Sequence, residues 1–91
     1  MPTASVNSMK PKSIRLYVKS FCGWCREAKD WLDERGIAYD EINVSADRVA
    51  FDEMRRLTGQ SKAPCIEVDG EWLADFGADE LARWWLQNNF E

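Results

Sequence analysis

A pair of cysteines, Cys22 and Cys25, stands between a strand-like and a helix-like segment and constrains the fold more than any other feature. The run 14–18 reads as a strand, and a helical pattern begins at Cys22 and continues to about Gly36. Residues three apart on a helix have Cβ atoms roughly 5–6 Å apart, so a small rearrangement of the first turn gives disulfide geometry. The sequence therefore predicts two thiols at a helix N-terminus that can open and close a disulfide.

The position of the pair also assigns a role to each thiol. The first N–H groups of a helix lack partners and carry the positive end of its dipole, which favours a thiolate at Cys22. Lys19 and Arg26 add positive charge on the same side. We interpret Cys22 as the nucleophile and Cys25, one turn further on, as the resolving thiol.

Two other interpretations of the pair stay open. A zinc site needs four nitrogen or sulfur ligands, and this chain has three cysteines and no histidine. A purely structural disulfide would close only a two-residue gap, which removes little chain entropy from the unfolded state. Both considerations favour redox chemistry over metal binding or cross-linking.

The length of 91 residues fits one domain, which we place at residues 14–91 after a flexible tail at residues 1–13. Hydrophobic residues make up 45% of the chain, which is typical of a packed globule, yet no apolar run approaches the length of a membrane span. The N-terminal residues lack the apolar stretch of a secretory signal. An odd cysteine count with one C-x-x-C pair suits a reducing compartment, so we expect a cytoplasmic protein without a membrane partner.

The charge distribution argues against a nucleic-acid partner. Up to residue 26 the chain has five basic residues and no acidic one, whereas the remaining 65 residues carry 7 basic and 16 acidic side chains. The excess of acidic side chains after residue 26 would repel the phosphate backbone of a nucleic acid. The basic end coincides with the cysteine pair, where it would attract anionic thiols or acidic partner surfaces.

The rest of the chain predicts an alternation of strands and helices. A strand over 39–44 precedes a helix that Ser45 caps and Gly59 ends, and Pro64 then introduces a strand over 65–68. Asp69-Gly70 signals a type I′ hairpin into a strand over 71–74, and the last helix runs from about Ala78 to Asn88. The second helix continues through Phe51, Met54 and Leu57. The first and last helices are expected to bury Ala28, Trp31, Leu32, Leu81, Trp84 and Trp85. The order β-α-β-α-β-β-α predicts an α/β domain with a mixed, four-stranded sheet flanked by helices.

Three separated segments resemble the glutaredoxins, small members of the thioredoxin fold, and the resemblance covers residues 14 to about 89. The segment 19–25, KSFCGWC, is similar to the family's Lys-x-x-Cys-Pro-Tyr-Cys signature, with Gly and Trp in place of Pro and Tyr. Ala63-Pro64 matches a Val-Pro pair whose proline is cis and faces the disulfide in the family. Gly77-Ala78-Asp79-Glu80 resembles the Gly-x-Asp-Asp segment that opens the last helix.

This resemblance implies a thiol–disulfide oxidoreductase with glutathione as co-substrate and no metal. Lys19 would meet the glycine carboxylate of glutathione, assisted by Gln60, where many relatives have arginine. The backbone of Ala63, next to the cis-proline, would pair with the cysteinyl unit as in strand addition. Asp79, after Gly77 at the helix N-terminus, would hold the γ-glutamyl end, and Trp24 would border the pocket. Disulfide-containing or glutathionylated proteins are the expected partners of a monomer.

The departures from the family pattern support two alternatives. Phe76 stands where glutaredoxins usually carry the first of two glycines, and the segment 63–71 resembles the redoxins that serve class Ib ribonucleotide reductases. Those relatives take electrons from thioredoxin reductase and lack a good glutathione site. The other alternative is a dimer that holds a [2Fe-2S] cluster through Cys22 and glutathione, as in some glutaredoxins lacking the motif proline, which Gly23 replaces here.

The third cysteine, Cys65, follows Pro64 at the start of a predicted central strand. We interpret Cys65 as a small buried hydrophobic residue without a part in the chemistry.

Overall fold

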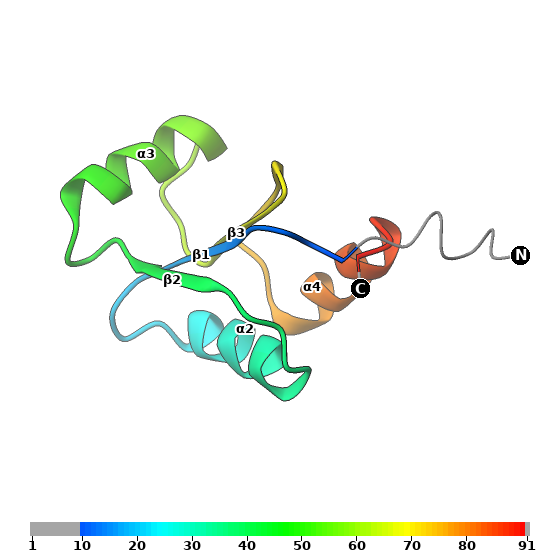
Figure 1. The fold of residues 1–91 in the computed structure, drawn as a ribbon. Coiled ribbons are helices and arrows are strands. Elements are labelled where there is room, and N and C mark those ends of the chain that lie inside the picture. Colours follow the sequence, from blue (N-terminus) through cyan, green and yellow to red (C-terminus); the bar gives the residue numbers. More distant parts are fainter. Residues whose placement is uncertain (1–9, 91) are drawn as a thin grey trace, which may run out of the picture.

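The computed structural model describes residues 10–90, and its elements follow the predicted order (Figure 1). They are β1 (Ile14–Val18), α2 (Gly23–Glu34), β2 (Asp40–Asn43), α3 (Arg48–Thr58), β3 (Cys65–Val68), β4 (Glu71–Ala74) and α4 (Ala78–Gln87). The strand predicted over 39–44 is one residue shorter at each end, and the other three strands have the predicted bounds. Between residues 10 and 90 no helix is long and apolar enough to cross a membrane.

The four strands form one mixed sheet, as predicted, and their order in the sheet is β2-β1-β3-β4. β1 runs parallel to β2, which it reaches through the α2 crossover, and antiparallel to β3. β3 and β4 form an antiparallel hairpin, whose turn residues Asp69 and Gly70 have φ values of 49° and 91°. Two successive positive φ values are typical of a type I′ turn, and they confirm the prediction from the Asp-Gly pair.

The hairpin turn also holds the start of the folded domain. The carboxylate of Asp69 accepts hydrogen bonds from the backbone N–H groups of Lys12, at 3.1 Å, and of Ser13, at 2.8 Å. Of the tail predicted for residues 1–13, residues 1–9 lie outside the described part of the chain. The hairpin thus fixes the direction from which the chain enters β1.

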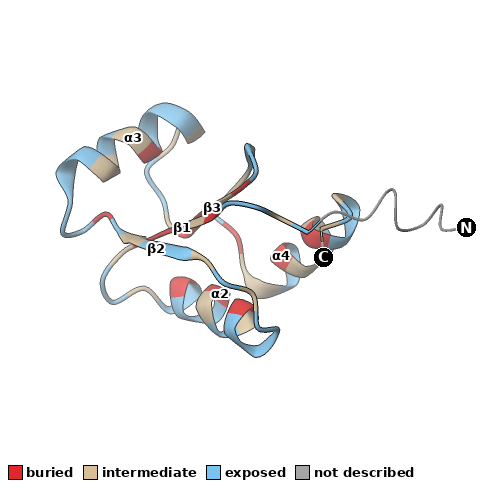
Figure 2. Cartoon of the chain, viewed as in Figure 1, coloured by how far each residue is buried: buried red, intermediate tan, exposed pale blue. Residues whose placement is uncertain are grey.

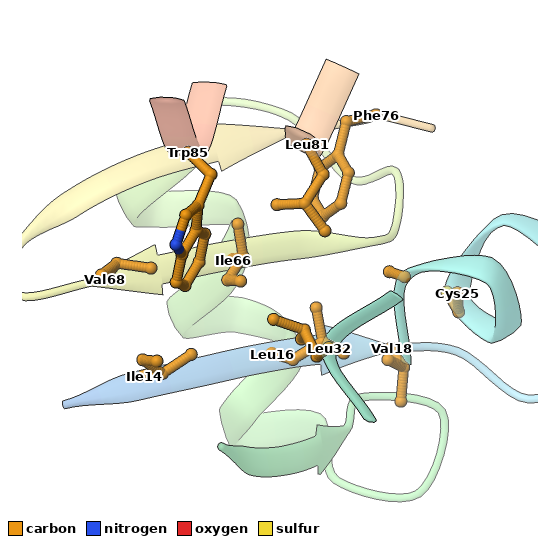
Figure 3. Close-up of a cluster of buried hydrophobic side chains, with 11 residues drawn as sticks. Ile14, Leu16, Val18, Cys25, Leu32, Ile66, Val68, Phe76, Leu81 and Trp85 are labelled. Carbon is orange, nitrogen blue, oxygen red and sulfur yellow. The ribbon is translucent and has the colours of Figure 1, made fainter. Parts of the chain in front are cut away.

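Helices cover both faces of the sheet: α2 and α4 lie on one face and α3 lies on the other (Figure 1). Each helix turns its buried residues toward the sheet and its exposed residues toward solvent (Figure 2). The larger cluster of buried side chains, between the sheet and the α2–α4 layer, is drawn in Figure 3. It contains Ile14, Leu16, Val18, Cys25, Ala28, Leu32, Ile66, Val68, Phe76, Leu81 and Trp85. Cys25 belongs to this cluster, so the packing of the core positions the cysteine pair.

The smaller cluster lies between the sheet and α3 and is built around Tyr17, Val44, Met54 and Cys65. The ring of Tyr17 is fully buried, and its hydroxyl donates a hydrogen bond of 3.0 Å to Glu53. Burial, and next this hydrogen bond, raise the pKa of Tyr17 to about 12. The same two causes, with Asp33 as the acceptor at 3.0 Å, raise the pKa of Tyr39 to about 12.

The structure corrects several predictions about burial and capping. Trp31 and Trp84, which were expected in the core, are only half-buried. In the last turn of α3, Leu57 is 42% exposed. The predicted cap Ser45 is also wrong, because α3 begins later and Asp47 accepts the N–H of Ala50 at 3.1 Å. The other residues that were expected in the core are buried, namely Ala28, Leu32, Leu81 and Trp85. In α3, Met54 is buried and Phe51 is half-buried.

Candidate active site

The cysteine pair forms a disulfide at the N-terminus of α2, with the two Cα atoms 5.2 Å apart. Cys22 is the N-cap residue with an extended backbone, and the N–H of Cys25 donates to its sulfur at 3.2 Å. Cys25 is only 2% exposed, whereas Cys22 is half-buried. Cys22 therefore presents the sulfur that a substrate can reach, and the N–H of Cys25, in the first turn of α2, is aimed at the place where its thiolate charge would lie.

A cis-proline lies against this disulfide. The Ala63–Pro64 peptide bond is cis, as the resemblance implied, and the carbonyl oxygen of Ala63 lies 4.0 Å from the sulfur of Cys22. Pro64 is buried, and its carbonyl accepts the N–H of Asp75 at 2.9 Å, which ties the proline loop to the residues that precede α4. The backbone of Ala63 is thereby held beside the reactive sulfur, where an extended peptide could pair with it.

The N-terminus of α4 approaches the disulfide through Trp24. The indole ring of Trp24, 61% exposed, packs so close to Gly77 that a Cβ on Gly77 would lie 3.1 Å from the ring atom Cζ3. Gly77 caps α4, and its N–H donates to the carboxylate of Glu80 at 3.2 Å. Asp79 is exposed in the first turn of α4. The structure thus brings three predicted site residues, Trp24, Gly77 and Asp79, to one side of the cysteine pair.

The two predicted carboxylate anchors, Lys19 and Gln60, already have partners within the chain. The ammonium group of Lys19 lies 5.5 Å from the ring centroid of Phe51 on α3. The side-chain amide of Gln60 accepts the N–H of Lys62 at 2.6 Å and donates to the carbonyl of Lys62 at 3.0 Å and to the sulfur of Cys65 at 3.2 Å. The amide of Gln60 therefore supports the loop that leads to Ala63, and it does not project into open space.

Phe21 is a prominent residue of the site that sequence reasoning did not single out. Its side chain is fully exposed and its φ of 58° lies in the left-handed region, which is uncommon for a bulky residue. The preceding residue is fixed, because the N–H of Ser20 donates to Ser45 at 3.0 Å and the amide of Asn43 donates to the hydroxyl of Ser20 at 3.3 Å. The position directly before the nucleophile was the only sequence signal that could have pointed to Phe21.

A small basic hollow of about 250 Å³ lies beside this loop. Its lining includes Cys22 and Cys25 together with the side chains of Lys19, Arg26 and Lys29. Arg26 and Lys29 each lie within 3.4 Å of a carboxylate, those of Asp30 and Glu41, so their charges are partly neutralised. The predicted positive charge near the cysteine pair is present, but these ion pairs reduce its field.

Cys65 is fully buried, as predicted. Its thiol donates to the carbonyl of Lys62 at 3.2 Å and accepts from Gln60. Burial raises the pKa of the Cys65 thiol, and hydrogen bonds with Asp75, Gln60 and Thr58 oppose that effect only in part. The neutral, enclosed thiol has the character of a packing residue.

Comparison with known proteins supports the same conclusion as the geometry, namely a redox-active cysteine pair beside a cis-proline. The glutaredoxin family model matches residues 14–73, which include the disulfide, the cis-proline, the strands β1 to β3 and all of β4 except its last residue. A glutaredoxin-like protein of 8.6 kDa encoded in the rubredoxin operon of Clostridium pasteurianum is 34% identical over 70 residues, which cover 77% of this chain and 93% of that relative.

Two further relatives carry the name NrdH. The glutaredoxin-like protein NrdH of Lactococcus lactis is 36% identical over 70 residues, covering 77% of this chain and 96% of the relative. The solved structure of the NrdH-redoxin from Escherichia coli, a glutaredoxin-like protein described by its thioredoxin-like activity profile, superimposes with a TM-score of 0.66 at 25% identity, covering 78% of this chain and 92% of that one. The family match over residues 14–73, together with the disulfide at the N-terminus of α2, shows that the chain belongs to the glutaredoxin family of thiol–disulfide oxidoreductases.

Proposed function

We propose that this oxidoreductase takes its electrons from glutathione and reduces glutathione mixed disulfides and protein disulfides. The observation that carries the proposal is the contact of Trp24 with Gly77, which draws the N-terminus of α4 and Asp79 toward the cysteine pair. A glutathionyl group joined to Cys22 would then have Ala63 on one side and the first turn of α4 on the other. The positive end of that helix and the carboxylate of Asp79 suit the two charges of a γ-glutamyl group.

The reductive half of the proposed cycle uses Cys22 first. The Cys22 thiolate, facing the N–H of Cys25, attacks one sulfur of the substrate disulfide, and the other sulfur leaves as a thiolate. A mixed disulfide joins Cys22 to the substrate at this stage. This step is neither a net oxidation nor a net reduction, because one disulfide has replaced another and one thiolate has replaced another.

Two routes complete the cycle. In the first, Cys25 attacks the sulfur of Cys22, the substrate leaves fully reduced, and the disulfide of the present structure forms. Two glutathione molecules then reduce this disulfide by successive exchange and leave as glutathione disulfide. In the second, a glutathione thiolate attacks the mixed disulfide of a glutathionylated Cys22, which regenerates the Cys22 thiolate and releases glutathione disulfide. Since Cys25 is buried beneath Cys22, the first route needs only a local rearrangement of the first turn of α2.

The proposed roles of the other site residues follow from their positions. Ala63 offers its backbone to the cysteinyl unit, Trp24 borders the groove, and Lys19 contributes the positive charge for the glycine carboxylate. Gln60, which we expected to assist Lys19 directly, is assigned an indirect role, because its amide is engaged with Lys62 and Cys65. We also propose that the protein works as a cytoplasmic monomer.

A second candidate, a redoxin recharged by thioredoxin reductase that delivers electrons to ribonucleotide reductase, is favoured by specific observations. Phe76 fills the position where a glutathione-binding relative would carry glycine, and its side chain is 2% exposed. The engaged amide of Gln60 leaves Lys19 as the single predicted side-chain anchor for the glycine carboxylate. The similarity to the Lactococcus lactis NrdH protein points in the same direction.

The electron donor distinguishes the two candidates. The experiment compares the initial rate of disulfide reduction in two coupled systems, one with glutathione and glutathione reductase and one with thioredoxin reductase, both followed by NADPH oxidation. We expect turnover to be faster with the glutathione system. A protein that is recharged by thioredoxin reductase and not by glutathione would overturn the proposal in favour of the second candidate.

A further inference from the structure

A hollow of about 820 Å³ lies at the end of the α2–α4 layer that is remote from the cysteine pair. Its walls come from residues 10–14, from the C-terminal half of α2 with the following loop, and from α4. Its volume is within the range of roughly 300–1,000 Å³ that is usual for small-molecule sites. The 12 residues of α2 span about 18 Å, so a small ligand at its C-terminal end would not reach the sulfur of Cys22.

The walls of this hollow are apolar and aromatic. Trp31 and Trp85 meet there edge to face, with ring centroids 5.5 Å apart, and Ile37 completes the wall. Figure 3 shows Trp85 beside Val68, with Ile14 at the same end of the core and Cys25 at the opposite end. Leu86 stands at the hollow with 76% of its surface exposed, so a ligand would remove a large apolar side chain from water.

The charged side chains that line the hollow are all cationic. They belong to Lys10, Lys12 and Arg35, and within residues 10–90 no carboxylate is among the lining residues, although the whole chain has a net charge of −4. Arg35 is held in place, because its guanidinium lies 4.0 Å from the ring centroid of Trp31 and donates to the carbonyl of Trp31 at 3.1 Å. The neighbouring carboxylate of Glu34 is 4.0 Å away, and both partners are exposed, so this ion pair is weak.

We propose that the hollow binds a small organic anion with a flat apolar body and one acidic group, that is, an aromatic carboxylate or sulfonate. The two indole rings and Leu86 contact the apolar body, while Arg35 and the two lysines pair with the acidic group. A neutral aromatic molecule would gain no attraction from the three cations, and a cationic one would be repelled by them. This site is independent of the electron donor and of the disulfide chemistry.

The test uses the oxidised full-length protein and the fluorescent anion anilinonaphthalene sulfonate as the probe. We expect saturable binding that is weakened about tenfold by Arg35→Glu, through charge reversal, and about tenfold by Leu86→Glu, through a carboxylate facing an apolar ligand. Arg56→Glu and Val49→Glu serve as matched controls. The first reverses a charge as Arg35→Glu does, and the second places a carboxylate on an exposed apolar residue as Leu86→Glu does, but both residues are exposed on α3, on the other face of the sheet. Neither control should change the affinity by more than about twofold.

Two further readouts locate the site and its charge preference. Naphthoate should displace the probe, whereas the neutral naphthalene carboxamide should not. In two-dimensional NMR spectra, naphthoate should shift the indole N–H signals of Trp31 and Trp85 and leave the amide of Cys22 unchanged. Equal displacement by the neutral compound, equal weakening by the α3 controls, or shifts confined to other residues would overturn the proposal.

Discussion

Replacing Asp79 by alanine tests the glutathione groove most sharply, because this carboxylate is exposed in the first turn of α4 and forms no hydrogen bond or ion pair within residues 10–90. In the proposed complex Asp79 contacts the γ-glutamyl end of glutathione, far from the reacting sulfur. A solvent-exposed, charge-assisted contact of this kind contributes about 1.4 kcal/mol, equivalent to a factor of about ten in affinity. Asp79→Ala should therefore raise KM for a glutathionylated peptide about tenfold and leave kcat nearly unchanged.

The neighbouring residue Glu80 provides the matched control. Its carboxylate accepts the N–H of Gly77 at 3.2 Å, so Glu80→Ala removes the same charge from the same turn but also removes a helix cap. This variant should lose about 1 kcal/mol of unfolding free energy and keep its KM within about twofold. Asp79→Ala should lose only the helix-dipole contribution, about 0.3–1 kcal/mol.

Steady-state kinetics with two substrates separate the possible causes. The variants are assayed with a glutathionylated peptide and with a disulfide that contains no glutathione, and their thermal unfolding is measured in parallel. Asp79→Ala should affect only the first substrate. Equal effects on both substrates, or an equal rise of KM in Glu80→Ala, would refute a direct contact and would favour recharging by thioredoxin reductase.

Three other expectations concern the thiols and the tyrosines. Cys22→Ser should abolish reduction of mixed disulfides in a standard turnover assay, whereas Cys65→Ser should leave the chemistry nearly unchanged because that thiol is buried away from substrate. Cys25→Ser should keep substantial activity on a glutathionylated peptide and lose activity on a protein disulfide that needs both thiols; loss of both would reject the second route of the cycle. Both tyrosines, Tyr17 and Tyr39, should ionise near pH 12 in the native protein, against about pH 10 in denaturant, as followed by absorbance near 295 nm. Their folded pKa values lie above the unfolded ones, so the unfolded state loses these protons first, and the free energy of unfolding should fall between about pH 10 and pH 12; a constant free energy across this window would contradict the assignment.

The sequence predicted the elements well where residues with strong local preferences mark their ends. Asp69-Gly70 encodes a turn with two positive φ values, and Pro64 forces the preceding residue to be extended, so the hairpin and β3 appeared at their predicted positions. The cysteine pair was placed correctly at a helix N-terminus for a similar reason, because its neighbours switch from strand to helix periodicity within a few residues.

Other features depend on contacts between distant parts of the chain, and local patterns could not reveal them. Ser45 has the character of a cap, but its hydroxyl is engaged with Ser20, and Asp47 caps α3 in its place. Gln60 was expected to assist Lys19, yet its amide turns back onto its own loop. The left-handed backbone of Phe21 likewise follows from the tie between its loop and the end of β2, which has no signature in the residue itself.

The central claim is that Cys22 is the nucleophile and that its sulfur carries the glutathionyl group. The most direct measurement incubates reduced Cys25→Ser protein with glutathione disulfide and maps the modified residue by mass spectrometry of its peptides. We predict one glutathionyl group per chain, on Cys22, that is removed by added glutathione. Modification of the buried Cys65 in place of Cys22, or no modification at all, would contradict the account.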